Sequence, residues 1–281
     1  MPFLDLLQQV MSDSREDFPL LVQAQSLAWR LTRFDDANCY HELKAQLEEH
    51  GDSLPESEVS TLYRLLLNYC YARVNAEEPG WEEEVNALHV KLLENGILVS
   101  QGQIPAGIFK NIVQGRLNVA DLDGVRKFLE EWGSRIQDDT QGAALIYNQG
   151  LLAFYEQDFG VCLRAMETVL RDYRADVHYG IDARVIALMC VFERNKSEDW
   201  MQEFEARLNA FRLYLIRDQR MEEARRVRHL ELVKHFRKLM SLHQDAPGQR
   251  QQRALKFIEG IQSLKPASKR RWFERQASAY E

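Results

Sequence analysis

Cys162 is the first side chain in this sequence that could do chemistry, because a cysteine thiolate is a strong nucleophile. It lies in the stretch YNQGLLAFYEQDFGVCLRAMETVLRD, residues 147–172, among carboxylates and tyrosines. A reactive cysteine needs a positively charged neighbour or a helix N-terminus that lowers the pKa of the thiol. Cys162 lies early in an expected helix, but its neighbour Arg164 projects to another face of that helix. We therefore predict that Cys162 is a small packing residue and not a nucleophile.

Histidines are the next candidates, because they are common metal ligands and general bases. The seven histidines include no pair three or four residues apart, and no glutamate lies three residues before a histidine. The spacings of the HExxH zinc site and of the ExxH di-iron site are therefore absent. Glu231 and His235 share a helix face, where an ion pair is the expected interaction. The sequence predicts no metal site.

Other catalytic patterns are also missing. The phosphate-binding motifs GxxxxGK[ST] and GxGxxG and the nucleophile motif GxSxG do not occur. Adjacent carboxylates occur at Glu48–Glu49, Glu77–Glu78, Glu82–Glu84 and Glu222–Glu223. They fall on polar helix faces or in first turns, where acidic residues favour the helix dipole. We predict no catalytic residue and no cofactor, and an enzyme remains only a third interpretation, since a fold does not determine a function.

Apolar residues follow a helical period through most of the chain. The clearest helix face has steps of four, four, three and four residues, and its members are Trp200, Phe204, Leu208, Phe211 and Leu215. Prolines stand where helices are expected to begin, as at Pro55, Pro105 and Pro266. The one run considered for a strand is Gly96–Val99.

The sequence thus predicts an all-α fold of fourteen helices joined by short loops. The predicted ranges are 3–12, 19–32, 36–49, 56–74, 80–95, 105–116, 122–137, 140–157, 159–173, 178–194, 198–216, 219–242, 249–263 and 267–279. Antiparallel helix pairs without a sheet must bury their apolar faces against neighbouring pairs, as in a helical solenoid.

Residues 146–166 carry a resemblance to the tetratricopeptide repeat, a helix-turn-helix unit of 34 residues. The positions that match its pattern are Ile146, Gly150, Asp158, Phe159, Cys162 and Met166. Thirty-seven residues earlier the same spacing recurs, at Phe109, Ile112, Asp121, Leu122, Val125 and Leu129. In this second copy, Val113 and Val125 replace the usual small residues. In the helix pair expected at 178–216, Trp200 replaces the small residue of the second helix. Residues 145–239 also resemble uncharacterised bacterial proteins of this kind.

This resemblance implies a right-handed α-solenoid that binds a partner in a concave groove lined by the first helix of each pair. The groove positions that it implies on two successive first helices are Lys110, Gln114, Asn118, Tyr147, Leu151 and Tyr155. Gly150 would stand where two helices approach each other closely.

Charge is unevenly distributed along the chain. Residues 217–281 contain sixteen Lys and Arg against eight Asp and Glu, a net of +8, whereas residues 1–216 carry a net of −15. We predict an acidic solenoid, 1–216, and basic C-terminal helices, 217–281, which cap it within one continuous domain. The cap would pack against the acidic body or against a second copy.

Three weaker signals indicate where in the cell we expect the protein. The N-terminus MPFLDLLQQV has no basic residue before its apolar run, so we expect no secretory signal. No window of eighteen uncharged apolar residues is present, so we expect no membrane contact. The four cysteines show no CxxC spacing, which suits reduced thiols in a bacterial cytoplasm.

The predicted function is a non-enzymatic scaffold or adaptor that binds a protein or peptide partner, with association between two copies left open. Affinity would come from buried aromatic residues and specificity from charges at the rim. The alternative is a nucleic-acid-associated or regulatory protein. Its phosphate contacts would come from residues 217–281, where Lys269–Phe273 places three basic residues beside two aromatics.

Overall fold

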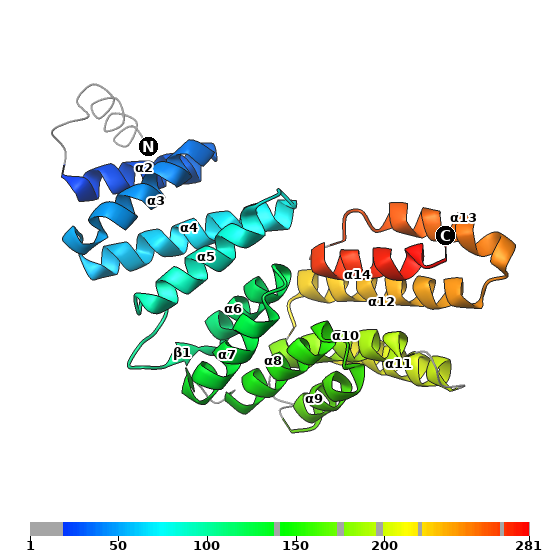
Figure 1. The fold of residues 1–281 in the computed structure, drawn as a ribbon. Helices are drawn as coiled ribbons and strands as arrows, with labels where there is room; N and C mark the ends of the chain where they lie inside the picture. The colour runs from blue at the N-terminus through cyan, green and yellow to red at the C-terminus, as the bar shows by residue number, and fades with distance from the viewer. Residues whose placement is uncertain are drawn as a thin grey trace. The chain divides into compact units, whose positions relative to one another are not determined.

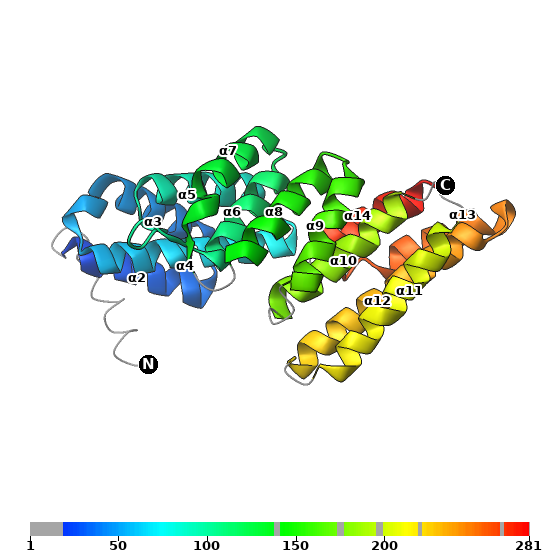
Figure 2. The ribbon, with the colours of Figure 1, turned by 90° about the horizontal axis from the view of Figure 1, so that it is seen from below.

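The computed structural model describes residues 19–137, 141–172, 177–194, 199–218, 221–264 and 267–280, and the helix predicted at 3–12 lies outside them. Nearly all of the described chain is α-helical (Figures 1 and 2). The thirteen helices in these ranges are α2 (Leu20–Phe34), α3 (Ala37–His50), α4 (Glu56–Ala76), α5 (Trp81–Glu94), α6 (Ala106–Asn118), α7 (Leu122–Trp132), α8 (Gln141–Tyr155), α9 (Phe159–Asp172), α10 (Val177–Glu193), α11 (Trp200–Arg217), α12 (Glu223–Gln244), α13 (Pro247–Gly260) and α14 (Ala267–Ser278).

The predicted all-α class is confirmed, and consecutive helices pack neighbour to neighbour, as a helical repeat requires. The chain divides within α5 into two compact units, one ending at Leu88 and the other beginning at His89. The predicted charge boundary after residue 216 lies inside the second unit. Among the described helices, none combines the length and the apolar composition needed to cross a membrane.

The predicted helix 122–137 is too long. Helix α7 ends at Trp132, and a 3-10 turn, Gly133–Arg135, leads into the two-residue strand β2 (Ile136–Gln137). This strand pairs in parallel with β1 (Ile104–Pro105). Ile104 and Ile136 are fully or nearly fully buried, at 0% and 2% exposure, so burial of these two side chains ends the helix. The run Gly96–Val99 contributes turns and no strand.

Three turns between helices share one geometry. A residue with positive φ is followed by an aspartate at the start of the next helix, at Asp35–Asp36, Ala120–Asp121 and Gln157–Asp158. Each aspartate side chain accepts a backbone N–H two or three residues later, from Asn38, Gly124 and Val161 respectively. The last two turns are thirty-seven residues apart in the sequence, so the local structure repeats at the predicted spacing.

An aromatic cluster organises the first unit. The Tyr40 and Tyr69 rings stack at 5.3 Å between centroids, and Trp81 meets Tyr40 edge-on at 5.0 Å. The Tyr40 hydroxyl donates to Glu84 Oε1 at 2.5 Å, and Lys44 Nζ donates to the same oxygen at 2.6 Å. Burial opposes ionisation of Glu84, yet these two hydrogen bonds lower its pKa below the usual value. The carboxylate therefore ties α3 to α5.

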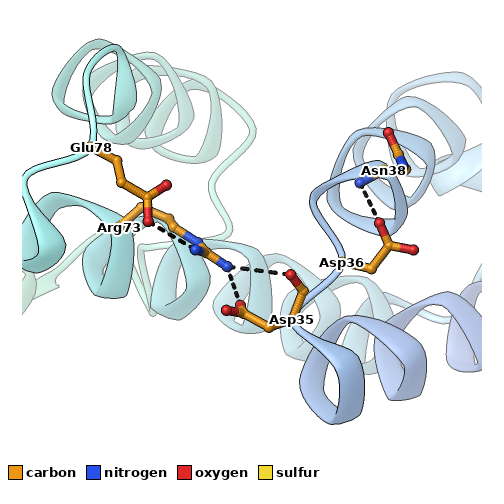
Figure 3. Close-up of polar contacts among 5 residues, drawn as sticks. All are labelled: Asp35, Asp36, Asn38, Arg73 and Glu78. Atoms are coloured by element: carbon orange, nitrogen blue, oxygen red, sulfur yellow. Dashed lines mark hydrogen bonds and ion pairs between the residues drawn. The ribbon is translucent and has the colours of Figure 1, made fainter.

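Arg73 of α4 joins two turns of the first unit (Figure 3). Its Nη1 donates to Glu78 Oε1 at 2.8 Å, and its Nη2 binds both the carboxylate and the carbonyl oxygen of Asp35. The hydrogen bond to Glu78, followed by that to Asp35, raises the pKa of Arg73. The guanidinium also lies 4.6 Å from the centre of the Tyr69 ring. Arg73 thus fixes the turn after α2 relative to the turn after α4.

Helices α8 and α9 cross closely at Gly150 in the second unit. A Cβ atom placed on Gly150 would lie 2.7 Å from the Cβ of Ala165 and 2.6 Å from Met166 Cε. Real Cβ atoms do not approach other carbon atoms so closely. The close approach predicted at Gly150 is therefore confirmed.

The C-terminal helices pack on α10 and α11. The Trp272 ring of α14 lies 5.7 Å from that of Phe192 on α10, and Phe236 of α12 lies 5.9 Å from Phe204 on α11. Trp272 Nε1 donates to Glu193 Oε1 at 2.8 Å. Figure 1 shows α14 beside α12 and α13, which it contacts. Aromatic packing and hydrogen bonds thus hold part of the basic segment on the preceding helices.

Candidate functional site

The six predicted partner-binding residues lie on two adjacent helices of the second unit. Lys110, Gln114 and Asn118 follow one another at steps of four along α6, and Tyr147, Leu151 and Tyr155 do so along α8. Because residues four apart share a helix face, each set forms one stripe. Helix α8 contacts both α6 and α10. In the predicted repeat, each of these three helices would be the first helix of its pair. We call the surface formed by these stripes the first-helix face.

At one end of the first-helix face the structure brings three predicted residues together. Gln114 Nε2 donates to Asn118 Oδ1 at 2.8 Å and also lies 3.4 Å from the Tyr155 hydroxyl. All three side chains are partly exposed. An amide side chain has two N–H donors and a carbonyl acceptor, so this group offers several hydrogen-bonding positions to a ligand.

At the other end the first-helix face is closed by an ion pair. Lys110 forms a salt bridge with Asp182 of α10, and its Nζ lies 5.2 Å from the ring centre of Tyr147 and 5.4 Å from that of Tyr179. Tyr147 and Leu151 are only 4% and 3% exposed. These two predicted contact residues therefore support the surface from below and present little area to a partner.

Burial dominates the electrostatics of Tyr147. Loss of solvent, followed by the negative charge of Asp182, raises the pKa of the Tyr147 hydroxyl well above its usual value. The tyrosine is therefore neutral throughout the physiological range and serves as an aromatic platform for the Lys110 ammonium.

Sequence reasoning did not place Tyr179, Asp182 and Lys269 at this end of the first-helix face, where the structure has them. Lys269 of α14 also approaches Asp182, with Nζ 3.7 Å from Oδ1. Burial alone would raise the pKa of Asp182, but Lys269 and Lys110 lower it to about 2. One signal was available: Asp182 is a charged residue in a helix whose neighbouring positions are almost all apolar.

His229 of α12 is a partly buried histidine close to Asp182 and Lys269. Its pKa is lowered to about 4, first by burial and then by the positive charges of Lys269, Arg225 and Arg228. The pKa of His89 is also lowered to about 4, first by burial and then by the positive charge of Arg116. Both imidazoles are therefore neutral at pH 7.

The cysteine considered as a nucleophile is a core residue. Cys162 is fully buried, at 0% exposure, in the contact between α8 and α9. Its carbonyl oxygen lies where a Cβ on Gly150 would touch it, at 3.6 Å. Within the part of the chain that the structure describes, no three His, Cys, Asp or Glu side chains are placed to hold a metal ion together. The first-helix face is built from hydrogen-bonding groups and aromatic rings, which suit recognition.

No protein-family model matches the sequence, and a search of curated proteins finds no match. The resemblance to the tetratricopeptide repeat stays a prediction from the residue spacing.

Proposed function

We propose that this chain is a non-enzymatic scaffold or adaptor that binds a peptide or a helix along the first-helix face. The observation that carries the proposal is the partly exposed group formed by Gln114, Asn118 and Tyr155 on two adjacent helices. Its amide and hydroxyl groups can bind peptide N–H and C=O groups, and the surrounding helices hold it in place.

The finer description of the fold belongs to the same proposal. The chain would be a right-handed tetratricopeptide-like solenoid in which α6, α8 and α10 are first helices. The thirty-seven-residue recurrence of the Asp121 and Asp158 turns and the close crossing at Gly150 support this arrangement. The four cysteines are buried as free thiols, which suits the proposed cytoplasmic location.

Nucleic-acid binding through residues 217–281 is the weaker candidate. Arg275 pairs with Glu193 of α10, and Lys269 lies near Asp182 of the same helix, with Nζ 3.7 Å from Oδ1. Trp272 and Phe273 are 5% and 1% exposed, so their rings cannot stack on bases without leaving the core. These contacts favour a structural role for the basic run.

A comparative pull-down tests the proposal. The bait is the full chain, either unchanged or with Gln114, Asn118 and Tyr155 all replaced by Ala. A matched control carries Ala at three exposed glutamines of α11 and α13, namely Gln202, Gln251 and Gln252. We expect the unchanged and control baits to retain the same polypeptide from a lysate of the native cell, and the triple variant to lose it.

Two results would overturn the proposal. Retention of the same polypeptides by all three baits would show that the first-helix face is not used. Loss of all captured material after nuclease treatment would favour the nucleic-acid alternative.

A further inference from the structure

The ion pairs around Asp182 have an unusual stoichiometry. Elsewhere in the described chain, several partly buried or bridging cations pair with two carboxylates each: Arg73 with Asp35 and Glu78, Arg126 with Asp123 and Glu156, and Arg207 with Glu167 and Glu203. At Asp182 the ratio is reversed, because Lys110 and Lys269 converge on one carboxylate from two different helices.

This group is poorly solvated. The side chains of Lys110, Lys269 and Asp182 are 28%, 17% and 21% exposed, respectively. The rings of Tyr147 and Tyr179 lie beneath Lys110 and exclude water from one side. A net positive charge in such a place is costly unless an anion or a hydrogen-bond acceptor compensates it.

The two lysines are also unequal in their contacts with Asp182. Lys110 makes a direct salt bridge to Oδ2, whereas Lys269 stays 3.7 Å from Oδ1, beyond hydrogen-bonding distance. The ammonium of Lys269 therefore keeps donors for a second acceptor.

We propose that Lys110 and Lys269 form a binding site for one carboxylate group of a ligand, with Asp182 as the counter-ion that the two ammonium groups share. A carboxylate carries the single negative charge that the group lacks, and its two oxygens can each accept a hydrogen bond from a different lysine. The site joins α6, α10 and α14, so its ligand would link the first-helix face to the C-terminal helix. It does not depend on the proposed peptide binding, because a free carboxylate is sufficient to occupy it.

The test uses acetate as the carboxylate probe and the full chain in a low-chloride buffer at pH 7. Line broadening of ¹³C-labelled acetate in NMR spectra measures binding as the acetate concentration is raised. We expect saturable binding to the unchanged protein. Lys269→Met should weaken it about fivefold or more, because a charge-assisted hydrogen bond is lost.

Asp182→Asn distinguishes a ligand site from a structural ion pair. This change leaves two ammonium groups without a carboxylate, so acetate should bind more tightly than to the unchanged protein. Lys44→Met is the matched control, because Lys44 pairs with the carboxylate of Glu84 in the first unit, and it should leave acetate binding unchanged. Lys269→Arg, which keeps the charge, should retain binding if Lys269→Met fails to fold.

Three results would overturn the inference. They are absence of saturable acetate binding, equal binding by the unchanged protein and the folded Lys269→Met variant, and weaker binding by folded Asp182→Asn. A ³¹P experiment with inorganic phosphate tests the ligand class. Phosphate binding that excludes acetate and depends on Lys269 would show that the site takes a phosphate and not a carboxylate.

Discussion

Replacing Gly150 by alanine tests the helix crossing on which the second unit is built. The new methyl group would lie 2.7 Å from the Cβ of Ala165, a backbone-anchored atom that cannot move unless α9 shifts. Met166 Cε, at 2.6 Å, is the end of a flexible side chain and can rotate away. The contact with Ala165 therefore determines the cost.

The magnitude follows from two opposing terms. Alanine is favoured over glycine inside a helix by about 1 kcal/mol. Overpacking a close contact costs about 1–3 kcal/mol. We expect Gly150→Ala to lower the free energy of unfolding by about 1 kcal/mol, and Gly150→Leu to lower it further because its branched side chain needs more space.

Urea unfolding followed by far-ultraviolet circular dichroism measures both variants. Gly107 of α6 provides the matched control, because a Cβ placed there meets no atom within 4 Å. Gly107→Ala should stabilise the protein by about 0.4–1 kcal/mol. If Gly150→Ala stabilised the protein as much as Gly107→Ala does, the close crossing of α8 and α9 would be refuted.

Two further predictions concern Arg73 and His89. Arg73→Ala removes the hydrogen bonds to Asp35 and Glu78 and should lower the stability of the first unit by about 1 kcal/mol. The expected loss is small because both carboxylates are exposed to solvent. An unchanged midpoint of urea unfolding would contradict this role of Arg73. The pKa of His89 is about 4 in the folded protein and about 6.5 when unfolded, so the unfolded state binds more protons between these values. The free energy of unfolding should therefore decrease by up to about 3 kcal/mol as the pH falls from 6.5 to 4, and His89→Leu should reduce this decrease. The same pH dependence in the variant and in the unchanged protein would contradict the lowered pKa of His89.

Helix positions were predictable because they depend on local sequence. The apolar period, the aspartates that cap α7 and α9, and the small residue at Gly150 each act within one helix-turn-helix unit. The end of α7 was not predictable, because Ile136 leaves the helix to pair with Ile104, which is 32 residues away in the sequence. A two-residue strand has no periodic pattern that a sequence could reveal.

The candidate site was predictable only in part, for a similar reason. The resemblance to the tetratricopeptide repeat implied that Gln114, Asn118 and Tyr155 share a surface, and the structure brings these three side chains together. Tyr147 is buried beside Tyr179 of α10 and Lys110 of α6, and the place of Lys269 depends on how α14 packs. Such contacts between distant segments follow from tertiary packing and not from spacing.

Site-specific photo-cross-linking tests the central claim most directly. A benzoylphenylalanine at position 118 would lie on the proposed binding surface, and one at the exposed position 202 would lie on the second helix of a pair. In the native cell, we predict a cross-linked polypeptide from position 118 and not from position 202. The same products from both positions, or cross-links only from position 256 in the basic segment, would contradict a binding role for the first-helix face.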